Sequence, residues 1–227
     1  MELLGILGRG IQRLTPNGPW VLTENLEVCD EKGAHLPVRA PADDSNPRCL
    51  IGGGELNLLA GLELCKDYRK KLQVVVCAYG QRSPYLQSIN APSESEVMSE
   101  WLTIQLIGKD KPEILVWLRD RVVDGPSNTN RELQNILELA VERGFTKVGV
   151  VTVAVHYARA LLMAQRHLVK PEFSHLELQF FASEDVVLKA DPKAYRPRIV
   201  AMHRSDAFMR NFSREINGIN CLLAGRY

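Results

Sequence analysis

Five short apolar runs, rich in β-branched residues, recur along the chain and predict β-strands. Hydrophobicity is nearly continuous in two of them, "QVVVCA" and "VGVVTV", which is typical of strands that are buried on both faces. The predicted strands are residues 3–7, 72–78, 114–118, 148–153 and 176–181.

Segments with apolar residues three or four positions apart separate these strands and predict helices. The predicted helices are residues 55–72, 94–107, 130–143, 158–168 and 205–223. Regular alternation of strand and helix favours a Rossmann-like three-layer α/β fold, with a mainly parallel sheet of about five strands and helices on both faces. We predict one domain over residues 1–227.

Residues 14–49 interrupt this rhythm, because they are rich in proline and contain the polar stretch "APADDSNP". We predict an irregular insertion after the first strand. Within it, "WVLTENLEV" and "AHLPVR" flank a turn at Gly33 and suggest a hairpin. This insertion is a candidate lid over a ligand.

Composition removes several classes of function. Lys and Arg number 28 against 27 Asp and Glu, so the net charge of +1 gives no general attraction to nucleic acid or to an anionic membrane. The odd cysteine count, five, with no C-x-x-C pair, indicates neither a disulfide framework nor a zinc site. No signal peptide or membrane span is recognisable, and we expect a cytoplasmic protein. The oligomeric state stays open.

Ligands of parallel α/β sheets bind beyond the carboxyl ends of the strands. After the first strand, Gly8 and Gly10 flank Arg9, so the backbone can approach a ligand and Arg9 can pair with a phosphate or carboxylate. Three further glycines, Gly52, Gly53 and Gly54, lead directly into a helix. Such a loop either holds an anion on backbone N–H groups or is only a turn that ends the insertion.

The next two strand ends are less specific. A turn containing Gly80 precedes a long loop, and Glu94 then either contacts a ligand or favours the dipole of the helix that it begins. Ser93 and Glu96 have the spacing of a capping box. After the strand at residues 114–118, the next predicted helix is preceded by Ser127, Asn128 and Thr129. Their hydroxyl and amide groups could cap that helix or bind a ligand.

The end of the predicted strand at residues 148–153 offers the clearest chemistry. Thr152 ends the strand, and His156 and Arg159 share one face of the helix that follows. His156 could transfer protons near neutral pH, and Arg159 could hold a phosphate or carboxylate. The alternative is a solvated helix start with a surface arginine. The remaining histidines lack ligand spacing, so we predict no metal site.

These motifs together resemble the YdcF/SanA/ElyC-like family of bacterial α/β proteins, a domain of unknown function. The most specific match is the pattern T-x-x-x-H-x-x-R-A at Thr152, His156, Arg159 and Ala160. "SNT" followed by Glu132 is the next. The family carries an arginine where this chain has Asn57, which we therefore include among the candidate ligand-binding residues.

The resemblance implies a Rossmann-like sheet with a polar cleft at the strand ends. It also implies S-adenosylmethionine as a ligand of soluble members and cell-envelope polysaccharide metabolism for membrane-anchored ones. We expect a transferase or hydrolase that binds a small anionic or nucleotide-like ligand, with His156 as the proton-transfer group. The alternatives are a non-catalytic ligand-binding or regulatory protein, or a cell-envelope metabolism factor.

Overall fold

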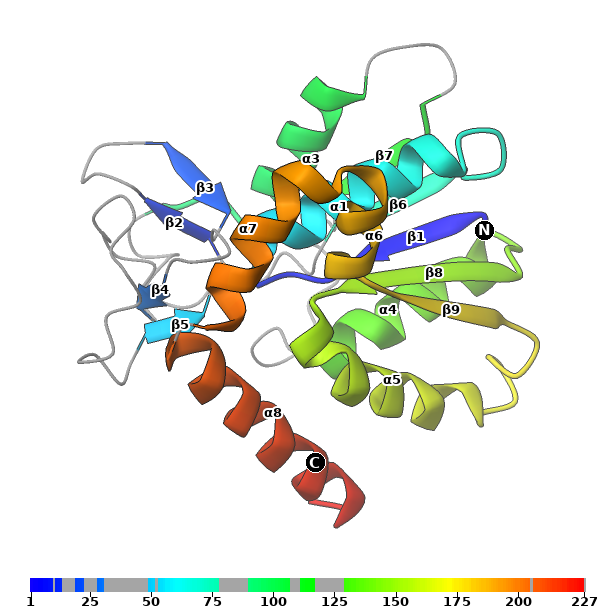
Figure 1. Ribbon diagram of the computed structural model, residues 1–227. Coiled ribbons are helices and arrows are strands. Elements are labelled where there is room, and N and C mark those ends of the chain that lie inside the picture. The colour runs from blue at the N-terminus through cyan, green and yellow to red at the C-terminus, as the bar shows by residue number, and fades with distance from the viewer. Residues whose placement is uncertain are drawn as a thin grey trace.

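A computed structural model of the chain describes residues 1–9, 11–13, 19–22, 28–30, 49–51, 53–77, 90–106, 111–116, 129–204 and 206–226 (Figure 1). Within these ranges, no helix is both long enough and apolar enough to cross a membrane.

A five-stranded parallel sheet forms the centre of the structure, in the order β7-β6-β1-β8-β9 (Figure 1). The chain lays down β1, β6 and β7 in one direction and then returns to place β8 and β9 on the other side of β1. The strand order therefore reverses between β1 and β8, which is where such sheets bind ligands. All five predicted strands are confirmed, with ends within two residues of the prediction. They are β1 (Leu3–Ile6), β6 (Val74–Cys77), β7 (Glu113–Val116), β8 (Lys147–Thr152) and β9 (Glu177–Ala182).

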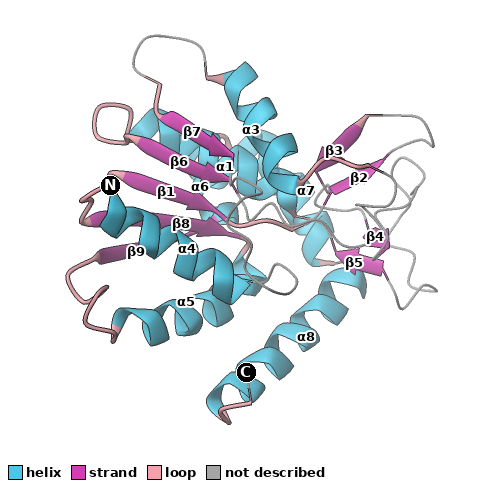
Figure 2. Ribbon diagram, turned by 180° about the vertical axis from the view of Figure 1, so that it is seen from behind, coloured by secondary structure: helices cyan, strands magenta, loops and turns pink. Residues whose placement is uncertain are grey.

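Helices cover both faces of the sheet, as the three-layer prediction requires. On one face lie α4 (Thr129–Glu142) and α5 (Ala154–Leu168), seen in front in Figure 2. The other face carries α1 (Gly54–Asp67), α3 (Glu94–Gln105) and α6 (Ser183–Ala190). Each face has its own apolar core, because β1 and β8 send alternate side chains to opposite sides. The parallel α/β prediction is confirmed.

Three helices follow β9, and sequence periodicity predicted only the last of them. α6 is short, and α7 (Pro192–His203) contains Pro197 and has apolar residues on no single face, so neither gave a clear helical pattern. α8 (Asp206–Leu223) confirms the predicted helix at residues 205–223. It packs against α5 (Figure 1).

The described residues in and beside the insertion form two short antiparallel strand pairs. β2 (Ile11–Arg13) pairs with β3 (Trp20–Leu22), placing Ile11 opposite Leu22, and both of these side chains are buried. β4 (Val28–Asp30) pairs with β5 (Cys49–Ile51), which leads into the glycine loop before α1. The predicted turn at Gly33 and its second arm, residues 34–39, lie outside the described residues.

Close packing of α1 on β1 depends on Gly61. A Cβ atom there would overlap the Cδ1 atom of Ile6 and lie 3.0 Å from its Cγ1 atom. We expect Gly61→Val to lower the free energy of unfolding by about 1–3 kcal/mol, because the buried Ile6 has little room to move. Urea unfolding measures this loss. Lys66→Val places the same side chain at an exposed position of the same helix, where it removes an ion pair with Glu63 but disturbs no packing. Equal effects of the two substitutions would contradict the packing explanation.

Candidate functional site

His156 lies in the first turn of α5 and is held from both sides. Its side chain is 2% exposed. Its Nδ1 atom lies 2.9 Å from Oε2 of Glu215, on α8, and its Nε2 atom lies 3.0 Å from Oγ1 of Thr129, the first residue of α4. Three helices thus meet at one imidazole, which links a carboxylate to a hydroxyl.

The protonation of this trio follows from its contacts. Burial lowers the pKa of His156, against the opposing effect of its hydrogen bond to Glu215. Burial alone would raise the pKa of Glu215, but hydrogen bonds from His156 and Arg159 outweigh it and hold that pKa at about 2. Glu215 is therefore an ionised acceptor at neutral pH, and the tautomer with its proton on Nδ1 is the one that satisfies this carboxylate. Nη2 of Arg159 also lies 3.2 Å from Nδ1, and it donates to Oε1 of Glu215 at 3.1 Å. The unprotonated Nε2 then accepts a hydrogen bond from the Thr129 hydroxyl.

Glu215 also binds both arginines that the sequence assigned to a ligand. Arg159 donates from Nε to Oε2 at 2.5 Å and from Nη2 to Oε1 at 3.1 Å. Arg9 places Nη1 3.7 Å from Oε1. The predicted convergence of Arg9, His156 and Arg159 is thus observed, and a carboxylate that the sequence analysis missed joins them. The sequence does contain a hint of Glu215. This acid lies seven residues after Phe208 and seven before Leu222, so it falls among the apolar residues on the buried side of α8.

The glycine loop lies against the start of α5. Gly53 is the N-cap of α1, with a φ of 141° that favours glycine, and a Cβ atom there would lie 3.0 Å from Cγ1 of Val153. Gly53 and Gly54 are buried, and the N-cap residue, a glycine, has no side chain with which to cap this end of α1. The structure therefore brings part of the glycine loop next to the helix that carries His156.

Glu94 begins α3 and reaches the loop after β1. Its Oε1 atom accepts a hydrogen bond of 2.6 Å from the backbone N–H of Arg9, the residue after Gly8. The predicted capping box is confirmed, since Ser93 and Glu96 exchange hydrogen bonds of 2.6 and 3.1 Å.

Asn57 has a structural explanation that needs no ligand. Its side chain is fully buried, and its Nδ2 atom donates to the Leu7 carbonyl at 2.8 Å. Its Oδ1 atom accepts from the Ser183 hydroxyl at 2.7 Å. The amide therefore links the end of β1, α1 and the start of α6.

Two buried polar groups near the start of α5 have unused hydrogen-bonding capacity. Thr152 is fully buried, and its hydroxyl has no hydrogen-bond partner among the described residues. Glu184 accepts from the backbone N–H of Ala154 through Oε2 at 2.7 Å, while its Oε1 atom has no hydrogen bond within the same part of the chain. Burial raises the pKa of Glu184. Sequence analysis missed Glu184 because α6 was not recognised.

Some predicted site residues cannot be placed. They lie outside the described residues and are Gly10, Gly52, Gly80, Ser127 and Asn128. Across the ranges that the structure covers, no three His, Cys, Asp or Glu side chains are arranged to hold a metal ion.

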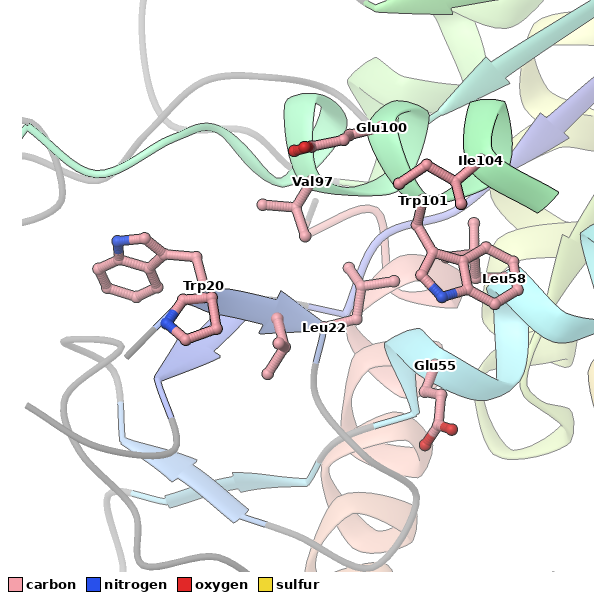
Figure 3. Close-up of a pocket in the computed structure, with 10 residues that line it drawn as sticks. Trp20, Leu22, Glu55, Leu58, Val97, Glu100, Trp101 and Ile104 are labelled. Carbon is pink, nitrogen blue, oxygen red and sulfur yellow. The ribbon is translucent and has the colours of Figure 1, made fainter. Parts of the chain in front are cut away.

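An apolar pocket of about 380 Å³ lies between α1, α3 and β3 (Figure 3). Its carboxylates, Glu55 and Glu100, lie on opposite sides of an apolar centre, and Glu55 accepts a 2.6 Å hydrogen bond from Arg198. The volume falls in the range of small-molecule sites. Three elements, β3, α1 and α3, supply the apolar lining of Leu22, Leu58, Val97, Trp101 and Ile104.

Comparison with known proteins found no matching family model, no matching curated protein and no matching solved structure. The resemblance to the YdcF/SanA/ElyC-like family therefore stays a prediction from the motifs.

Proposed function

We propose that this chain is an enzyme acting on a small substrate that carries or develops negative charge at the carboxyl edge of the sheet, with His156 as the proton-transfer group. The observation that carries this proposal is the neutral imidazole held between the Glu215 carboxylate and the Thr129 hydroxyl. A neutral imidazole with a fixed tautomer is a competent general base near neutral pH.

Arg9 and Arg159 support an anionic substrate or transition state. A guanidinium has five N–H donors in one plane, and Arg159 gives two of them to Glu215. Both guanidinium groups carry a permanent positive charge beside His156. Donors fixed in advance beside a reacting group stabilise developing negative charge. A transferase or a hydrolase fits this arrangement, and a nucleotide or S-adenosylmethionine remains a candidate ligand.

The second candidate is a ligand-binding or regulatory protein without turnover. The apolar pocket beside α1 favours it, because a pocket of this size can hold a small molecule whether or not chemistry follows. The two candidates differ in the role of His156, which an enzyme needs for rate and a binding protein needs only for affinity.

His156→Gln tests the proposal. We expect it to lower kcat by about 10²- to 10⁴-fold with little change in KM, because glutamine cannot take up a proton. Turnover would be measured against a panel of small esters, phosphate esters and nucleotides. Thermal shift on the same panel reports binding, since a ligand at about one hundred times its Kd adds about 2.7 kcal/mol of stability.

His167→Gln is the matched control. His167 lies on the same helix, is also buried, and donates one hydrogen bond of 2.9 Å from Nε2 to Oδ1 of Asn130. Ligands that stabilise wild type, and stabilise His156→Gln equally or less, without His156-dependent turnover of any compound, would favour the binding protein and count against the enzyme.

A further inference from the structure

The base position of His156 is already occupied. The lone pair of Nε2 faces Oγ1 of Thr129 at 3.0 Å, and the ring is almost entirely buried. The Glu215 side chain is 5% exposed. Thr129 is only partly buried, and so it is the member of the trio that an incoming molecule reaches first. A substrate therefore meets the hydroxyl, and its proton is the one that His156 can take.

We propose that Thr129 is a nucleophile that His156 activates, that Glu215 orients the His156 ring, and that the substrates of the protein are small carboxylic esters. This inference rests on the proposed function and specifies its reacting group. A hydroxyl within hydrogen-bond reach of a base, which a third group orients, is the recurrent arrangement of nucleophilic catalysis. It is recognised by geometry and not by chain order.

The chemistry balances without a further reactant except water. Oγ1 of Thr129 attacks the ester carbonyl carbon as its proton passes to Nε2, and Glu215 stabilises the imidazolium that forms. The ester C–O bond then breaks, and the imidazolium returns the proton to the departing alcohol, leaving an acyl group on Thr129. Water repeats the sequence at the acyl carbon and releases the acid and the free hydroxyl.

An acyl carbon suits this site better than a phosphoryl group. Phosphoryl transfer depends mainly on concentrated positive charge at the phosphate oxygens. Here Glu215 binds both guanidinium groups and reduces the positive charge that they present. A carbonyl needs stabilisation of one developing oxyanion, and Thr129 stands at the positive end of the α4 dipole.

A fluorophosphonate ester tests the inference on the full chain without knowledge of the natural substrate. The Thr129 oxygen would bond to phosphorus, the P–F bond would break, and the proton would leave with fluoride. We expect one adduct by intact mass, mapped to Thr129 by peptide sequencing. Thr129→Ser should keep the labelling and Thr129→Val should abolish it. His156→Gln should slow it by about 10²-fold or more.

Melting temperatures of Thr129→Ser and Thr129→Val establish that both variants are folded. Wild-type protein that takes up no label at Thr129, yet shows His156-dependent turnover of a panel compound, overturns the nucleophile and leaves the proposed function standing. Absence of both labelling and His156-dependent turnover overturns both. Thr129-dependent release of nitrophenol from p-nitrophenyl phosphate but not from p-nitrophenyl acetate overturns the assignment of esters as substrates.

Discussion

Glu215→Ala is expected to lower the free energy of unfolding by about 3–5 kcal/mol. Glu215 is the shared partner of His156, Arg159 and Arg9, and its side chain is almost fully buried. Removal of the carboxylate leaves two guanidinium groups in a poorly solvated place without the acceptor that holds them. Urea unfolding at neutral pH measures the loss.

Glu177→Ala provides the comparison for Glu215→Ala. Glu177 pairs with Lys147 at 3.6 Å, but both side chains are largely exposed, and such pairs contribute between zero and about 1 kcal/mol. If the two alanine variants unfold at the same urea concentration, the buried cluster does not stabilise the fold, and α8 would have to be held by its other contacts with α5, α7 and β5.

Low pH is expected to reduce the free energy of unfolding, because Glu215 takes up a proton. The pKa of Glu215 is about 2 in the folded chain, below its ordinary value of 4.5, so the unfolded chain takes up the proton first. Its contribution is therefore fully present above pH 4.5 and is lost as the pH falls towards 2. At about 1.4 kcal/mol for each pH unit between the two values, the loss amounts to about 3 kcal/mol.

Burial lowers the pKa of His156 as well, so its protonation destabilises the fold in the same direction, beginning near its ordinary value of 6.5. Unfolding free energies of wild type and Glu215→Gln between about pH 6 and pH 2.5 separate the contributions of His156 and Glu215. Only wild type should lose further stability below pH 4.5, because only it has the Glu215 carboxylate. A constant difference between these proteins below pH 4.5 would show that Glu215 does not titrate with a lowered pKa.

The sheet could be predicted from the sequence because its strands are buried on both faces. Residues such as Val74–Cys77 have no polar member, so the apolar run marks the strand almost to its ends. α6 and α7 could not be predicted this way. α6 is too short to show a repeat, and α7 carries a proline and charged residues around its circumference, so tertiary packing and not local pattern determines these helices.

The positions of three site residues could be predicted because ligands of a parallel sheet bind at the carboxyl ends of its strands. Arg9, Thr129 and His156 all lie just beyond strands or at helix starts, and the parallel sheet brings such positions to one edge. Glu215 follows no strand of the sheet. Its place beside His156 depends on how α8 docks on α5, and a contact across 59 positions leaves no local trace in the sequence.

The position of Glu215 in the chain also sets the order in which the site is assembled during synthesis. A polypeptide is made from its amino end, so every strand of the sheet and both helices that carry Thr129 and His156 leave the ribosome before α8 does. A nascent chain therefore has a hydroxyl and an imidazole but no carboxylate to fix the imidazole tautomer. Under the proposed function, competence for chemistry is coupled to the docking of α8, and we expect a chain that stops before α8 to be inactive.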